Sequence, residues 1–188
     1  MSKRRAFRFQ SFGVPEALTA QRQWVGWVDG IASPFALSGF SYFGLALPTW
    51  PPTWTDFRTA IDKRVDWGLD GVAYMVTRDD PLLFVTLHGA AERGRPSRAV
   101  RKLVRHCHTY AEVAPSGEDV TFVFAPANGD TAPRTQCGAF TPELLPDDCP
   151  LRGFDGGEVV CWPPWLHVPM SGMFVDFDNW IRVIELKE

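Results

Sequence analysis

Residues 71–87, GVAYMVTRDDPLLFVTL, hold the two apolar runs on which the fold of this chain depends. Each run has the length of a β-strand, and a polar turn separates them. In that turn, Asp79 and Asp80 can accept hydrogen bonds from nearby backbone amides, and Pro81 fixes its own φ angle. This combination favours a reversal of the chain. The sequence therefore predicts a β-hairpin over these residues.

An amphipathic helix is predicted next, beginning near Pro96-Ser97 and ending near Tyr110. Its apolar residues recur at i, i+3, i+4 and i+7, the spacing that places them on one helical face. These residues are Val100, Leu103, Val104 and Cys107. A third apolar run, Val120–Phe124, follows as a strand. Over Gly71–Phe124 the sequence therefore predicts the order strand, turn, strand, helix and strand.

The opposite side of the predicted helix is basic. Six of the 19 Lys and Arg residues lie between Arg93 and His108 with no Asp or Glu among them, although the whole chain has a net charge of −3. The basic residues on the helix are Arg98, Arg101, Lys102, Arg105 and His108. They form either an ordinary solvated face or a surface that contacts phosphates or an acidic partner. Arg4 and Arg5 supply a second basic group in the N-terminal arm.

Length and composition indicate one α+β domain. At 188 residues the chain can bury a core of its own, and 45% hydrophobic and 22% charged residues are ordinary for a globular protein. The four cysteines lie far apart without a Cys-x-x-Cys pair, no signal segment opens the chain, and no apolar run could span a bilayer. These features predict a cytoplasmic protein with reduced thiols and no membrane partner.

Weaker patterns divide the chain into three parts. They are a basic N-terminal arm and lead-in at 1–22, a main domain at 23–172, and a C-terminal segment at 173–188. Apolar residues at helical spacing in the last part predict a helix that starts near Asp176 and packs on the main domain. Within the main domain, residues 157–162 are predicted as a strand and residues 165–169 as its hairpin partner.

The first third of the main domain contains one strand and one helix. Gln23–Val28 is an aromatic-rich strand, preceded by a short helical turn at residues 15–18. After two prolines, Thr53 or Thr55 is predicted to cap a helix that ends by Gly68. The inner face of that helix is predicted to carry Phe57, Ala60, Ile61 and Val65.

The order of these landmarks resembles the bifunctional primase-polymerase (prim-pol) domain of phage and plasmid replication proteins, a branch of the archaeo-eukaryotic primase superfamily. The resemblance runs from about Gln23 to Gly172. It rests on QWVGW at 23–27, WTDFRTA at 54–60, DGVAY at 70–74, DDP at 79–81 and YAEVAPSG at 110–117. It implies an α+β fold with a mixed β-sheet flanked by helices.

The resemblance also implies where the chemistry of the family would lie. In the family, an Asp-x-Asp pair on the strand after DDP holds the divalent metals of phosphoryl transfer. Thr86 and His88 occupy those two positions here. The family's nucleotide-contacting His corresponds to Thr121, whereas its third metal-binding acid corresponds to Glu158 and is retained. The active-site positions are therefore degenerate at three of four places.

The turn that precedes Thr121 resembles the nucleotide-binding segment of the family. Ser116 and Gly117 are retained there as nucleotide-binding candidates, but Glu118 and Asp119 add two acids where a triphosphate would sit. One retained carboxylate cannot assemble a two-metal site. We therefore expect no catalytic residue, no bound metal and no cofactor, with Mg²⁺ or Mn²⁺ required only if the chain is an active enzyme after all.

Three functional hypotheses follow. The first is a catalytically inactive prim-pol-like protein of a phage or mobile-element DNA replication system, which binds DNA or a replication protein such as a helicase or polymerase. The second is a divergent, active DNA primase or polymerase with a rearranged metal site built from Glu158, His88 and nearby acids. The third is a phage-type protein-binding inhibitor of a host replication or defence factor.

Overall fold

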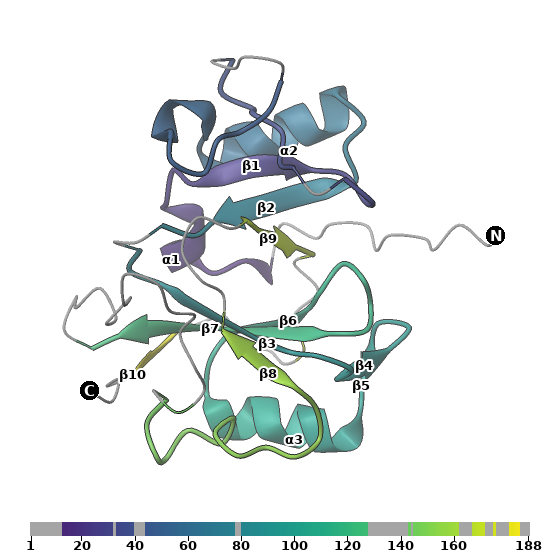
Figure 1. The fold of residues 1–188 in the computed structure, drawn as a ribbon, viewed down its shortest axis with the longest axis vertical. Helices are drawn as coiled ribbons and strands as arrows, with labels where there is room; N and C mark the ends of the chain where they lie inside the picture. Colours follow the sequence, from purple (N-terminus) through teal and green to yellow (C-terminus); the bar gives the residue numbers. More distant parts are fainter. Residues whose placement is uncertain are drawn as a thin grey trace.

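Two β-sheets and the helices beside them form the part of the chain that the computed structural model describes (Figure 1). That part comprises residues 13–31, 33–39, 44–77, 80–127, 143, 145–161, 167–171, 175 and 181–184. Sheet A has the antiparallel order β1-β2-β9, and sheet B has the order β10-β7-β3-β8 with β6 also paired to β7. In sheet B, β10 runs parallel to β7 and the other pairs are antiparallel. The predicted α+β class is therefore confirmed, but the strands belong to separate sheets.

The bounds of the strands and helices are as follows. Sheet A contains β1 (Trp24–Trp27), β2 (Gly71–Met75) and β9 (His167–Met170). Sheet B contains β3 (Leu83–Leu87), β6 (Ala111–Val113), β7 (Val120–Pro126), β8 (Val159–Cys161) and β10 (Arg182–Ile184). A small hairpin pairs β4 (Ala91–Glu92) with β5 (Arg95–Pro96). The helices are α1 (Glu16–Thr19), the 3₁₀ turn η2 (Pro51–Thr53), α2 (Phe57–Asp66) and α3 (Arg98–Cys107).

The predicted hairpin over residues 71–87 is wrong, because its two strands join different sheets. β2 lies between β1 and β9, and β3 lies between β7 and β8, so neither strand has an open side for the other. Both strands are buried along their whole length, as expected for central strands. Between the two strands, the buried carboxylate of Asp80 accepts hydrogen bonds from Gln23 Nε2, Tyr74 Oη and the backbone amides of Thr77 and Leu82.

Two further expectations near the C-terminus are corrected in the same way. β8 pairs with β3 in sheet B and β9 pairs with β2 in sheet A, so they do not form the predicted hairpin. Part of the predicted C-terminal helix, Arg182–Ile184, is the strand β10, which extends sheet B beside β7. Hydrogen bonding to a sheet edge overrides the helical spacing of the apolar residues there. The proposed helix start at Asp176 lies outside the described residues.

Helix α2 begins one residue later than predicted. Asp56 is its N-cap, and the carboxylate of Asp56 accepts a hydrogen bond from the backbone amide of Thr59 at 2.9 Å. Thr55 cannot cap the helix because its backbone exchanges two hydrogen bonds with Trp24. The helix ends at Asp66, before Gly68 as predicted, and the φ of Gly68 is 64°, in the left-handed region. Val65 was predicted to lie on the inner face of this helix, and that prediction is wrong, because 64% of the Val65 surface is exposed.

Replacing Asp56 by Ala is expected to lower the free energy of unfolding by about 1 kcal/mol at pH 7, the usual contribution of an N-cap carboxylate. The hydrogen bond from the Thr59 amide lowers the Asp56 pKa below its usual 3.8 in the folded state. The cap therefore stabilises the protein above that pH, and its contribution is lost as the pH falls through the folded-state pKa. Urea unfolding followed by tryptophan fluorescence measures this difference. An Ala variant as stable as the parent at pH 7 would contradict it.

Helix α3 agrees with its prediction. Ser97 caps it by accepting a hydrogen bond from the Val100 amide at 3.2 Å, and His108 closes it in the left-handed conformation. All four predicted inner residues are buried. They pack on Leu83, Val85 and Leu87 of β3, together with residues of β6 and β7. In Figure 1, α3 lies along sheet B at one end of the molecule, and α2 lies beside β1 and β2 at the other.

The other face of sheet B packs toward sheet A. Phe84 and Val123 belong to a second buried cluster that also contains Trp24 and Tyr74 of sheet A. The alternation of side chains along β3 therefore directs odd-numbered residues to α3 and even-numbered residues toward sheet A. Within the described ranges, no helix is both long and apolar enough to cross a membrane.

Candidate functional site

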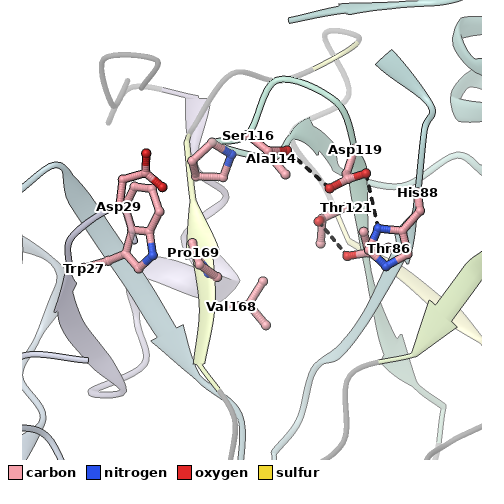
Figure 2. A pocket seen from close by; sticks show the side chains of 11 residues that line it. Trp27, Asp29, Thr86, His88, Ala114, Ser116, Asp119, Thr121, Val168 and Pro169 are labelled. Atoms are coloured by element: carbon pink, nitrogen blue, oxygen red, sulfur yellow. Dashed lines mark hydrogen bonds and ion pairs between the residues drawn. The ribbon is translucent and has the colours of Figure 1, made fainter. Parts of the chain in front are cut away.

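A pocket of about 250 Å³ lies where the two sheets meet. Figure 2 shows Trp27 and Asp29 on one side of it, Val168 and Pro169 of β9 beside them, and side chains of β3 and β7 on the other side. Among the described residues, the lining consists of Trp27, Asp29, Thr86, His88, Ala114, Pro115, Ser116, Asp119, Thr121, Val168 and Pro169. The pocket thus contains Thr86, His88 and Thr121, the three degenerate positions implied by the prim-pol resemblance.

Thr86 and Thr121 form the floor of the pocket. They are direct partners in the antiparallel pairing of β3 with β7, so both side chains leave the same face of sheet B. Their hydroxyl oxygens lie 2.8 Å apart and hydrogen bond to each other, and each residue is only 2% exposed. This floor presents two neutral hydroxyls, whereas the prim-pol resemblance would place a metal-binding carboxylate at Thr86 and a histidine at Thr121.

His88 and Asp119 form the polar wall above that floor. His88 Nδ1 lies 3.2 Å from Asp119 Oδ1, and 45% of the His88 side chain is exposed toward solvent. The same Asp119 oxygen accepts a hydrogen bond from the Gly89 amide at 3.1 Å, and Asp119 Oδ2 accepts one from Ser116 Oγ at 3.2 Å. Gly89 can present its amide there because its φ is 66°, a conformation that favours glycine. Three donors therefore hold the Asp119 carboxylate in place.

The remaining predicted residues of the degenerate site lie near the pocket but outside its lining. Gly117 has a φ of 74° and closes the tight turn after Ser116 by donating its amide to Ala114 O at 2.8 Å. Glu158 is exposed, and its backbone oxygen accepts a hydrogen bond from the His88 amide at 2.8 Å. The structure thus brings the backbone of Glu158 beside that of His88, and in the described part of the chain no side-chain contact between the two is seen.

The side chains of this pocket that could bind metal ions do not fit a two-metal centre. Such a centre needs several carboxylate oxygens that converge on the ions. The pocket lining contains two carboxylates, Asp29 and Asp119, and Figure 2 shows them on opposite sides of the cavity. Both oxygens of Asp119 already accept hydrogen bonds. Among the described residues, no group of three or more His, Cys, Asp or Glu side chains is arranged to hold a metal ion.

The basic residues of α3 form a surface separate from the pocket. Arg98, Arg101, Lys102, Arg105 and His108, which we call the α3 basic stripe, are all exposed. Because α3 covers the face of sheet B opposite Thr86 and Thr121, the stripe cannot contact a ligand in the pocket. In the described part of the chain, no ion pair involves Arg98, Arg101 or Lys102. Arg4 and Arg5, the second predicted basic group, lie outside the described residues.

Sequence reasoning missed the residues that sheet A contributes to the pocket. Trp27 ends β1, Asp29 follows two residues later, and Pro169 lies on β9, far away in the sequence. No spacing pattern links these residues, because only the meeting of two sheets brings them together. An acid two residues after an aromatic strand was the one local sign, since loops held by a rigid scaffold often carry functional side chains.

Comparison with known proteins gives one distant relationship. No family model matches the chain. Over 80 residues it is 28% identical to the DNA primase-polymerase of Nitratiruptor phage NrS-1. The similarity covers 42% of this chain and 11% of that protein, so the chain spans only a small part of the length of this relative. This similarity supports a distant relationship to a phage primase-polymerase, in agreement with the motifs.

Proposed function

We propose that this chain is a prim-pol-like protein of a phage or mobile-element replication system that has no nucleotidyl-transfer chemistry and acts by binding DNA. The observation that carries the first half of the proposal is the Thr86–Thr121 pair. By the prim-pol resemblance, Thr86 stands where metal-dependent polymerisation needs a carboxylate and Thr121 stands where a histidine would contact the nucleotide, and the two buried hydroxyls hydrogen bond to each other. The distant similarity to a phage DNA primase-polymerase supports a role connected with replication.

The α3 basic stripe supports the second half of the proposal. Helix α3 has no acidic residue in its first turn, and Arg98 is its first residue, next to the positive end of the helix dipole. A cation there opposes helix formation by a few tenths of a kcal/mol, so helix stability does not explain its presence. A row of exposed cations with no acid among them suits contacts to successive phosphates, each of which releases a condensed counterion.

DNA binding measured as a function of salt tests the role of the stripe. A double variant, Arg98→Ala with Arg101→Ala, is expected to reduce the slope of log affinity against log salt by about 1.4 on single-stranded DNA, roughly 0.7 for each lost phosphate contact. The matched control is Arg22→Ala with Arg58→Ala, which removes two exposed cations away from α3. If both double variants lose affinity equally, or if the parent does not bind DNA at low salt, the stripe is not a DNA surface and a protein partner becomes the better explanation.

Primer synthesis and extension assays with Mg²⁺ or Mn²⁺ test the absence of chemistry. We expect no template-dependent product from the parent chain. Product that disappears in Glu158→Ala would overturn the proposal in favour of a divergent enzyme with a rearranged metal site. Product that persists in Glu158→Ala would indicate a contaminating polymerase.

A further inference from the structure

The pocket between the sheets has an electrostatic character opposite to that of a nucleotide site. None of its 11 lining residues, all within the described ranges, is Lys or Arg. The carboxylate of Asp29 stands at its mouth on an exposed residue. Within the described part of the chain this carboxylate accepts no hydrogen bond, although the Asp29 backbone amide donates to Asp70 Oδ2 at 2.9 Å. An entering phosphate would meet repulsion from the negative charge of Asp29 at this mouth.

The opposite wall also offers acceptors. With its hydrogen on Nδ1, a neutral His88 donates to Asp119 and keeps Nε2 as an acceptor. Figure 2 shows the His88 ring pointing from β3 toward the cavity, across from Trp27 and Asp29. A ligand that enters between them meets hydrogen-bond acceptors and negative charge from both sides. This combination suits a group that carries several N–H donors and a positive charge.

The remaining lining is apolar and aromatic. Pro115, Val168 and Pro169 provide aliphatic surface, and Trp27 provides an indole ring at the rim beside Asp29. Long basic side chains bury their methylene stem against such surface while the charged head stays near water. A Trp face attracts an ammonium or guanidinium group, and a neighbouring carboxylate adds to that attraction.

We propose that this pocket binds the Lys or Arg side chain of a partner protein, without a metal ion. The aliphatic stem lies against Pro115, Val168 and Pro169, and the cationic head lies between Trp27, Asp29 and His88. This site is distinct from the α3 basic stripe, which lies on the other face of sheet B. The two surfaces therefore contact partners of opposite charge.

The test uses the whole chain at pH 8 and follows the indole N–H signal of Trp27 by NMR. The peptides Gly-Lys-Gly and Gly-Arg-Gly are expected to shift this signal in a saturable way. The Nε-acetylated lysine peptide keeps the stem and loses the charge, so it should bind at least about tenfold more weakly, a loss of about 1.4 kcal/mol. The Trp27 signal is assigned as the indole N–H signal that is missing from the spectrum of a Trp27→Phe variant.

Variants separate the proposed contacts from general charge effects. Asp29→Asn is expected to weaken Gly-Lys-Gly about tenfold, whereas Asp62→Asn on the exposed side of α2 should leave the affinity unchanged. Equal binding of the acetylated peptide, an absent Trp27 shift, or equal effects of the two variants would each overturn the proposal. A shift with a deoxynucleoside triphosphate and Mg²⁺ would overturn it as well. None of these outcomes bears on the salt-dependent DNA binding of α3, which is measured separately.

Discussion

Replacing Asp80 by Ala is expected to lower the free energy of unfolding by about 4 kcal/mol, a large part of the stability of a single domain. The Asp80 carboxylate is 2% exposed, and it accepts hydrogen bonds from Tyr74 Oη at 3.2 Å and from the amides of Thr77 and Leu82 at 3.2 and 3.0 Å. Gln23 Nε2 donates to it from the residue before β1. Its removal takes this acceptor away from four donors at the point where the chain passes from sheet A to sheet B.

Urea unfolding measures this loss of stability, and two further variants serve as comparisons. Asp80→Asn keeps the size of the side chain but turns an NH₂ group toward the same donors, so it is expected to cost nearly as much as Ala. Asp62→Ala removes an exposed carboxylate from α2 and should change stability by less than about 0.5 kcal/mol. If Asp80→Ala were no more harmful than Asp62→Ala, the connection between the sheets would not depend on this carboxylate.

The wrong prediction of a hairpin over residues 71–87 has a physical reason. Two apolar runs around an Asp-Asp-Pro turn have the local signature of a hairpin, and local signals carry no information on whether neighbouring strands already occupy both edges. β2 and β3 each pair with two other strands, and all four of those partners lie more than 30 residues away. Helix α3 was predictable because its N-cap, its inner face and its C-cap are all encoded within twelve consecutive residues, Ser97 to His108.

The candidate site could be predicted only in part for a similar reason. The family resemblance assigned Thr86, His88 and Thr121 to one degenerate site, and in the structure all three line one pocket, two of them on the paired strands β3 and β7. It did not predict that Asp119 would be held by His88 and by the Ser116 turn, since that depends on a hydrogen-bond network. The contribution of Trp27 depends on how sheet A meets sheet B. No sequence motif in either sheet predicts how the two sheets meet.

A second polar link between the sheets involves Glu112, which is fully buried on β6. Tyr110 Oη donates to Glu112 Oε2 at 2.6 Å, and the amide of Ser171, directly after β9, donates to Glu112 Oε1 at 2.7 Å. The side chain thus fastens the end of β9, a strand of sheet A, to sheet B. Replacing Glu112 by Ala is expected to cost about 3 kcal/mol, because it takes an acceptor from two buried donors and leaves a cavity.

The pH dependence of the free energy of unfolding distinguishes the Tyr110–Glu112 hydrogen bond from ordinary apolar packing. Burial, with the nearby Glu112 carboxylate, raises the pKa of Tyr110 well above its usual 10.0 in the folded state. Unfolded Tyr110 therefore loses its proton near pH 10 while the folded residue keeps it, and stability falls as the pH rises above 10. Tyr110→Phe removes this ionisation and should flatten the decline, at the cost of one hydrogen bond at neutral pH. Urea unfolding between pH 8 and pH 11 measures both effects. A decline of equal steepness in the parent and in Tyr110→Phe would show that other groups cause it, and that Glu112 and Tyr110 do not act as one buried unit.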